Sequence, residues 1–84
     1  MNRDEIKTTI SNILDTISMS KRHGLVIVEV IMPSFPHLDI PLNTPEQGIE
    51  VARRINEETG LATFARLATA SSVKYAKFPR KKED

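Results

Sequence analysis

The 84-residue chain has no cysteine, and its three glycines lie far apart. Without cysteine it cannot form disulfides, thiolate zinc sites or a cysteine nucleophile. The glycines at 24, 48 and 60 match neither G-x-G-x-x-G nor the Walker A pattern, the glycine-rich loops that bind phosphates. These absences argue against several common enzyme and nucleotide-binding classes.

The chain also lacks a long apolar run. The longest, LVIVEVIM at 25–32, is interrupted by Glu29, whereas a membrane-spanning helix needs about 20 apolar residues. Asp4 and Glu5 stand where a signal peptide would be basic and then apolar. We therefore expect a soluble, intracellular (cytoplasmic) protein with no membrane contact.

The length fits one small globular domain. The net charge is +1 but is unevenly distributed: residues 1–73 hold 7 Lys+Arg against 9 Asp+Glu, and residues 74–84 hold 5 against 2. We predict a single α+β domain over 1–79 and a charged, disordered tail over 80–84.

Two helices are predicted. The first runs from Asn2 or Arg3 to about Ser20, ahead of a stop at Gly24, and this places His23 beside a helix C-terminus. Its apolar stripe is Ile6, Ile10, Ile13, Leu14 and Ile17, which recur at helical spacing.

The second helix has the clearest signals. Thr44 is an N-cap, Pro45 suits the first helical position, and Gln47 completes a capping box. Gly60 is the expected C-terminal stop. Apolar residues share one side of this helix and charged residues the other, which is typical of a helix lying on a sheet with a solvated back.

The remaining segments indicate a sheet. Pro36 and Pro41 confine one of the strands to an edge, because proline has no N–H to donate. The order α-β-(β)-α-β-β predicts a small two-layer sandwich, with a three- to four-stranded antiparallel or mixed sheet and two helices on one face. The expected strands cover 25–32, 37–42, 61–69 and 72–78.

Four of the five prolines fall between Met32 and Pro45, a segment that we call the proline arch. Prolines at this spacing favour an extended, pre-shaped connection. The arch either only joins a strand to a helix or presents Phe35, His37 and Asp39 to a partner. A P-x-x-P ligand is the least favoured interpretation, since no basic residue flanks the motif.

Candidate catalytic and metal residues are few. A divalent metal site needs three or four ligands, and His37 and Asp39 have no further ligand at suitable spacing. Ser34, His37 and Asp39 lie too close along one extended segment to form a catalytic triad. We assign no catalytic residue, metal or cofactor, and expect a protein that is not an enzyme.

The strand at 25–32 is apolar on both faces. Glu29 needs a partner there, either Arg66 or a lysine of the last strand in a cross-strand pair, or else a ligand. Two helices on one face cannot cover the other, so that second face is a candidate for self-association. The residues predicted for this surface are Leu25, Ile27, Glu29 and Ile31.

The C-terminal segment interleaves basic and aromatic residues, a composition found in nucleic-acid-binding surfaces. The alternative is a solubilising edge strand guarded by lysines. The candidate residues are Lys74, Tyr75, Lys77, Phe78, Arg80, Lys81 and Lys82.

The sequence favours a small interaction module of the adaptor or inhibitor type, which binds a protein partner, self-associates as a homo-oligomer, or does both. Nucleic-acid binding through the basic C-terminal strand is the first alternative. The second is an oligomer that binds a small anionic ligand between its subunits, because such a pocket leaves no local motif.

Overall fold

The computed structural model describes residues 2–17, 23–32, 36–69 and 74–81. These residues form two helices and four strands in the order α-β-β-α-β-β. The elements are α1 (Arg3–Asp15), β1 (Val26–Val30), β2 (Leu38–Leu42), α2 (Pro45–Thr59), β3 (Thr63–Leu67) and β4 (Lys74–Phe78). The predicted α+β class and element order are confirmed, including the edge strand that contains Pro41.

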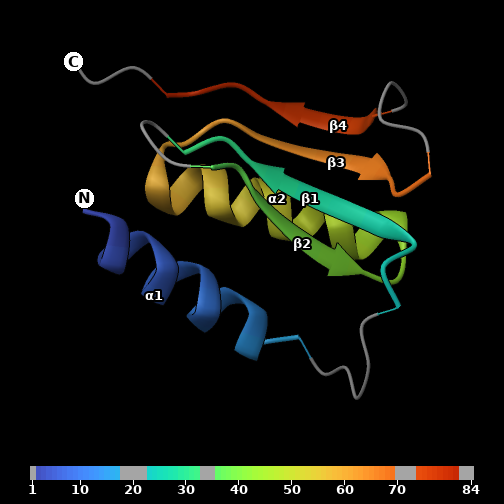
Figure 1. Cartoon of the computed structure of the whole chain (residues 1–84), viewed down its shortest axis with the longest axis horizontal. Coiled ribbons are helices and arrows are strands. Elements are labelled where there is room, and N and C mark those ends of the chain that lie inside the picture. Colours follow the sequence, from blue (N-terminus) through green and yellow to red (C-terminus); the bar gives the residue numbers. More distant parts are fainter. Residues whose placement is uncertain (1, 18–22, 33–35, 70–73, 82–84) are drawn as a thin grey trace.

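The four strands form one sheet in the order β2-β1-β3-β4, and every neighbouring pair is antiparallel (Figure 1). Val28 of β1 lies opposite Ile40 of β2 on one side and Ala65 of β3 on the other. Strands β2 and β4 are therefore the two edges, and β1 and β3 are central.

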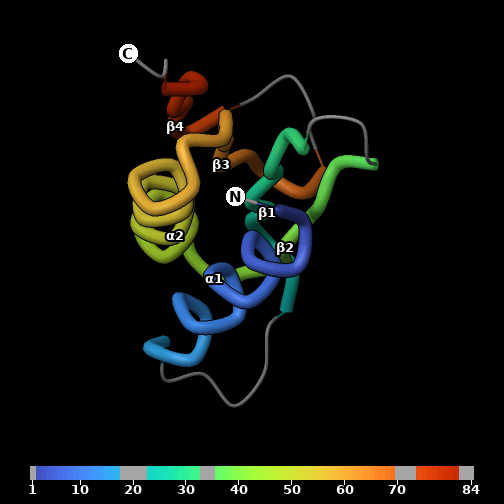
Figure 2. The backbone as a smooth tube through the Cα atoms, turned by 90° about the vertical axis from the view of Figure 1, so that its left-hand side faces the viewer, coloured from blue at the N-terminus to red at the C-terminus, as the bar shows by residue number. Residues whose placement is uncertain are grey.

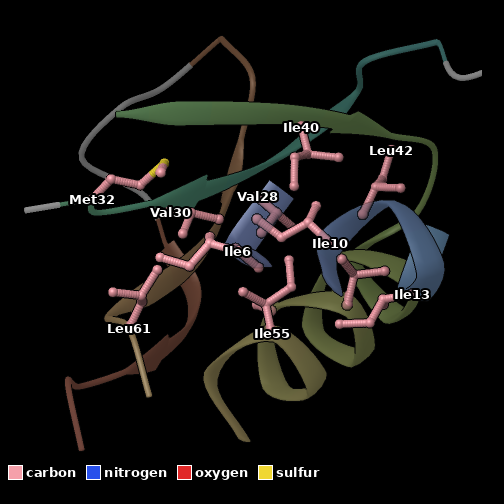
Figure 3. Packing of buried hydrophobic residues seen from close by; sticks show 13 residues of the cluster. Ile6, Ile10, Ile13, Val28, Val30, Met32, Ile40, Leu42, Ile55 and Leu61 are labelled. Carbon is pink, nitrogen blue, oxygen red and sulfur yellow. The ribbon is translucent and has the colours of Figure 1, made fainter. Parts of the chain in front are cut away.

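Both helices pack against the same face of the sheet (Figure 2). We call this the covered face. Its side chains come from alternate strand residues, as the pleat requires, and they meet the apolar stripes of the two helices (Figure 3). The core comprises Ile6, Ile10, Ile13, Val28, Val30, Met32, Ile40, Leu42, Val51, Ala52, Ile55, Leu61 and Ala65.

Helix α1 ends at Asp15, earlier than the predicted Ser20. The side chain of Thr16 bonds to the last turn of the helix: its hydroxyl donates to the carbonyl of Ile13 at 2.6 Å. The same hydroxyl accepts from Arg54 at 2.7 Å. Such a local side-chain bond competes with helix continuation. The prediction that His23 lies at the end of this helix is therefore wrong; the expected residues 18–20 fall outside the described part of the chain.

Helix α2 begins and ends where the sequence predicts. The Thr44 hydroxyl accepts from the N–H of Gln47 at 3.2 Å, and Gly60 ends the helix with a φ of 74°, a conformation that glycine adopts without strain. The return bond of the capping box is displaced by one residue, because Gln47 Oε1 accepts from the N–H of Asn43 at 3.2 Å.

The segment after β4 is attached to the end of α2. Buried Asn56 donates to the carbonyls of Leu61 and Pro79, both at 2.8 Å. The N–H of Lys81 donates to the carbonyl of Gly60 at 2.9 Å. The backbone is therefore bonded to the end of α2 at Lys81; the domain boundary after residue 79 stays a prediction, and residues 82–84 lie outside the described ranges.

Candidate interaction surface

The second face of the sheet points away from both helices, and we call it the open face. Its residues alternate along each strand with those that enter the core. All four residues predicted for self-association belong to it, together with Asp39 of the proline arch. Its members are Leu25, Ile27, Glu29, Ile31, Asp39, Pro41, Phe64, Arg66, Lys74 and Lys77.

Apolar surface remains accessible on the open face. Leu25, just before β1, is 61% exposed. Ile27, Ile31 and Phe64 are half-buried, so the side chains of this face shelter one another only in part. By contrast, Val28 follows Ile27 in β1 but points to the covered face, and it is fully buried.

Arg66 lies among the carboxylates of this face. Its Nε is 3.8 Å from Glu29 Oε2, which confirms the predicted cross-strand pair, and its Nη2 is 3.6 Å from Asp39 Oδ2. Both distances exceed the roughly 2.7–2.9 Å of a charge-assisted hydrogen bond. The Arg66 side chain is only 14% exposed, and its Nε has no hydrogen-bond partner among the described residues. The guanidinium therefore retains donor capacity.

The charges of the open face are segregated across the sheet. Strands β2 and β1 contribute the acidic Asp39 and Glu29, whereas β3 and β4 contribute the basic Arg66, Lys74 and Lys77. Lys74 also places its Nζ 3.9 Å from the centroid of the Phe64 ring, a cation–π geometry. One half of the face is thus acidic and the other basic.

The residues predicted for nucleic-acid binding do not share one surface. A register shift between Ala65 and Arg66 leaves Tyr75 as the extra residue of a bulge in β4, and Tyr75 is 41% exposed. Phe78 instead packs against the core. Arg80 and Lys81 are exposed, and Lys82 lies outside the described residues.

The proline arch contributes one residue to the open face. Asp39 lies in β2, opposite Glu29. His37 is exposed just before β2, and Phe35 lies outside the described ranges. Within those ranges, no group of three or more histidine, aspartate or glutamate side chains is placed to hold a metal ion.

Phe64 belongs to this surface although the sequence patterns did not indicate it. The alternation of Thr63, Phe64 and Ala65 could have assigned its face, since Thr63 and Ala65 are buried, but only the pairing of β3 with β1 brings it beside Glu29.

Comparison of the chain with protein-family models, curated proteins and solved structures finds no match. No helix in the described residues is long and apolar enough to cross a membrane.

Proposed function

We propose that the chain is a non-enzymatic interaction module that binds a protein partner through the open face, as an adaptor or inhibitor does. One observation carries the proposal: apolar side chains, with Leu25 the most exposed, remain on a sheet face that neither described helix covers. Exposed apolar patches of this kind usually mark association sites.

The polar groups of the open face also support binding. Arg66 lies at the centre of this face, beside Ile27 and Phe64, and arginine with aromatic residues is enriched where protein interfaces are most buried. Its loosely held guanidinium can donate to further carbonyl or carboxylate partners without breaking a short bond. Asp39, Lys74 and Lys77 lie toward the two edges, where they would form a polar rim.

The proposal is tested by retention on immobilised protein, with an open-face variant and a matched control. Leu25→Glu changes an exposed side chain, so the fold should be retained, while Glu58→Lys places a charge change on the exposed back of α2. Proteins retained by the wild-type chain and by Glu58→Lys should be lost with Leu25→Glu. Equal retention by all three, or a monomer at high micromolar concentration that retains nothing, contradicts the proposal.

Nucleic-acid binding is the second candidate, favoured by Lys74, Lys77 and Tyr75 along β4. Two observations weigh against it: Lys74 already occupies one side of the Phe64 ring, and Glu29 and Asp39 share the open face with the lysines. If the chain binds DNA or RNA, neutralising Lys74 and Lys77 should lower the salt slope of log K by about 0.7–0.9 for each phosphate that they no longer neutralise. No binding at low salt removes this candidate.

A further inference from the structure

The segregated charges of the open face are self-complementary, and this suggests which protein the face binds. We propose that its partner is a second copy of this chain, related by a two-fold axis that runs parallel to the strands between β1 and β3. This inference rests on the proposed function, because it assigns an occupant to the same face.

The sheet register determines which residues such an axis brings together. Asp39, Glu29, Phe64 and Lys77 form one row across the four strands. A two-fold axis along the strands lays β2 over the partner's β4 and keeps each row against itself. Asp39 then faces Lys77 of the partner subunit, and Glu29 faces the partner's Phe64.

The next row supplies the centre of the interface. It runs from Pro41 through Ile27 and Arg66 to Lys74. Across the axis, Ile27 lies against Arg66 of the partner subunit, whose aliphatic stem can pack on it. Ile27, Glu29, Phe64 and Arg66 are equally near the axis, so the middle holds two apolar residues beside the Glu29–Arg66 pair of each chain, and ion pairs between the subunits occupy the rim.

A two-fold axis perpendicular to the strands is disfavoured. It would lay β4 on the partner's β4 and bring Lys74 against the partner's Lys77, and it would lay β2 on the partner's β2, which leaves Asp39 opposite the partner's Pro41 without a cation. Like charges in contact destabilise an interface. The charge pattern therefore selects between the two arrangements and favours the axis along the strands.

The face is small, which sets the expected affinity. Four strands of five residues span roughly 19 Å by 17 Å. Two such faces amount to roughly 650 Å² of flat area, below the range of standard specific interfaces and typical of weak, transient ones. We expect a dimer with a dissociation constant in the micromolar range.

Charge exchange between the two edges tests the arrangement. Asp39 and Lys77 lie on opposite edge strands of one chain, three strand spacings or about 14 Å apart, so any coupling between them must pass through a partner. Sedimentation equilibrium should show dimerisation about 10-fold weaker for Asp39→Lys alone and for Lys77→Glu alone, because two rim pairs become repulsive in each homodimer.

Mixing the two variants in equal amounts should restore dimerisation to near the wild-type level. In the mixed dimer the introduced lysine of one chain meets the introduced glutamate of the other, and the second rim pair is unchanged. The controls are Glu58→Lys on α2 and Lys7→Glu on α1; both residues are exposed on the helical side, and both variants should dimerise like the wild type.

Three outcomes overturn the inference: a wild-type chain that stays monomeric at high micromolar concentration, a dimer indifferent to both charge changes, or a mixture that dimerises no better than its components. The first outcome is separable from failure of the proposed function. A monomeric chain whose retained proteins are lost with Leu25→Glu would still have a binding face, with a different occupant.

Discussion

The two faces of the sheet are built from alternate residues of the same strands, yet they are covered very differently. In β1, Val26, Val28 and Val30 are at most 1% exposed, whereas Ile27 and Glu29 between them are half-buried. Both helices contribute their apolar stripes to the covered face alone. The fold therefore draws its stability mainly from one face, and the apolar residues of the other face are available for association.

Polar groups differ between the two faces in the same way. On the covered side, the Thr63 hydroxyl donates to the carbonyl of Ala52 at 2.7 Å, and Asn56 makes two bonds of 2.8 Å. On the open face, the distances from Arg66 to its carboxylates are 3.6 and 3.8 Å. Buried polar groups must be paired to be tolerated. The polar groups of the covered side are therefore held by short bonds, whereas Arg66 on the open face is held only by long ion pairs.

The largest expected effect on the free energy of unfolding comes from replacing an isoleucine with alanine on each of the two faces. Ile40→Ala removes a side chain that is 4% exposed in the core and should lower the free energy of unfolding by about 2–5 kcal/mol. Ile27→Ala, one strand away on the open face, should cost the isolated chain about 1 kcal/mol, because its side chain buries less apolar area. Urea unfolding at a concentration below dimerisation measures both. Equal costs would contradict the contrast between the faces.

The polar contrast gives the second prediction. Asn56→Ala removes the donor for two carbonyls and should cost about 1–3 kcal/mol. Its open-face counterpart, Arg66→Met, should cost less than about 1 kcal/mol, because long, partly exposed ion pairs contribute little. Amide hydrogen exchange provides a local readout: the N–H of Lys81, bonded to Gly60, should exchange faster in Asn56→Ala and unchanged in Arg66→Met.

Close packing on the covered face gives the third. A Cβ added to Gly48 would lie 2.6 Å from Val26 Cγ1, so α2 approaches β1 more closely than a larger residue allows. Gly48→Ala should destabilise by about 1–2 kcal/mol, since overpacking outweighs the gain in helix propensity. Adding Val26→Ala relieves the contact, and a double-mutant cycle should show favourable coupling between the two changes. Additive costs would mean that the helix simply moves away.

How much of this the sequence could predict depends on how local each signal is. The bounds of α2 follow from Thr44, Pro45 and Gly60, which act on their immediate neighbours. The end of α1 could not be placed from its own sequence, because Thr16 is held partly by Arg54, which comes from a different helix. Glu29 and Arg66 could be paired from strand patterns, but the position of Asp39 beside them required the strand order. The bulge at Tyr75 follows from pairing with β3 and has no sequence signal that we recognise.

The smallest expected effect concerns the basic half of the open face. Lys74 lies over the Phe64 ring at 3.9 Å from its centroid, and such a partly exposed cation–π contact contributes about 0.5–1 kcal/mol. A double-mutant cycle with Lys74→Ala and Phe64→Leu should recover a coupling of that size, while the same cycle with Lys77→Ala should give a smaller one, although Lys77 lies directly opposite Phe64 in the register. If Lys77 couples to Phe64 as strongly as Lys74 does, the coupling reflects the overall positive charge of β4 rather than one cation–π contact. Phe64 would then be freer to meet a partner, and the central contacts of the open face would carry more of its binding energy than the rim charges.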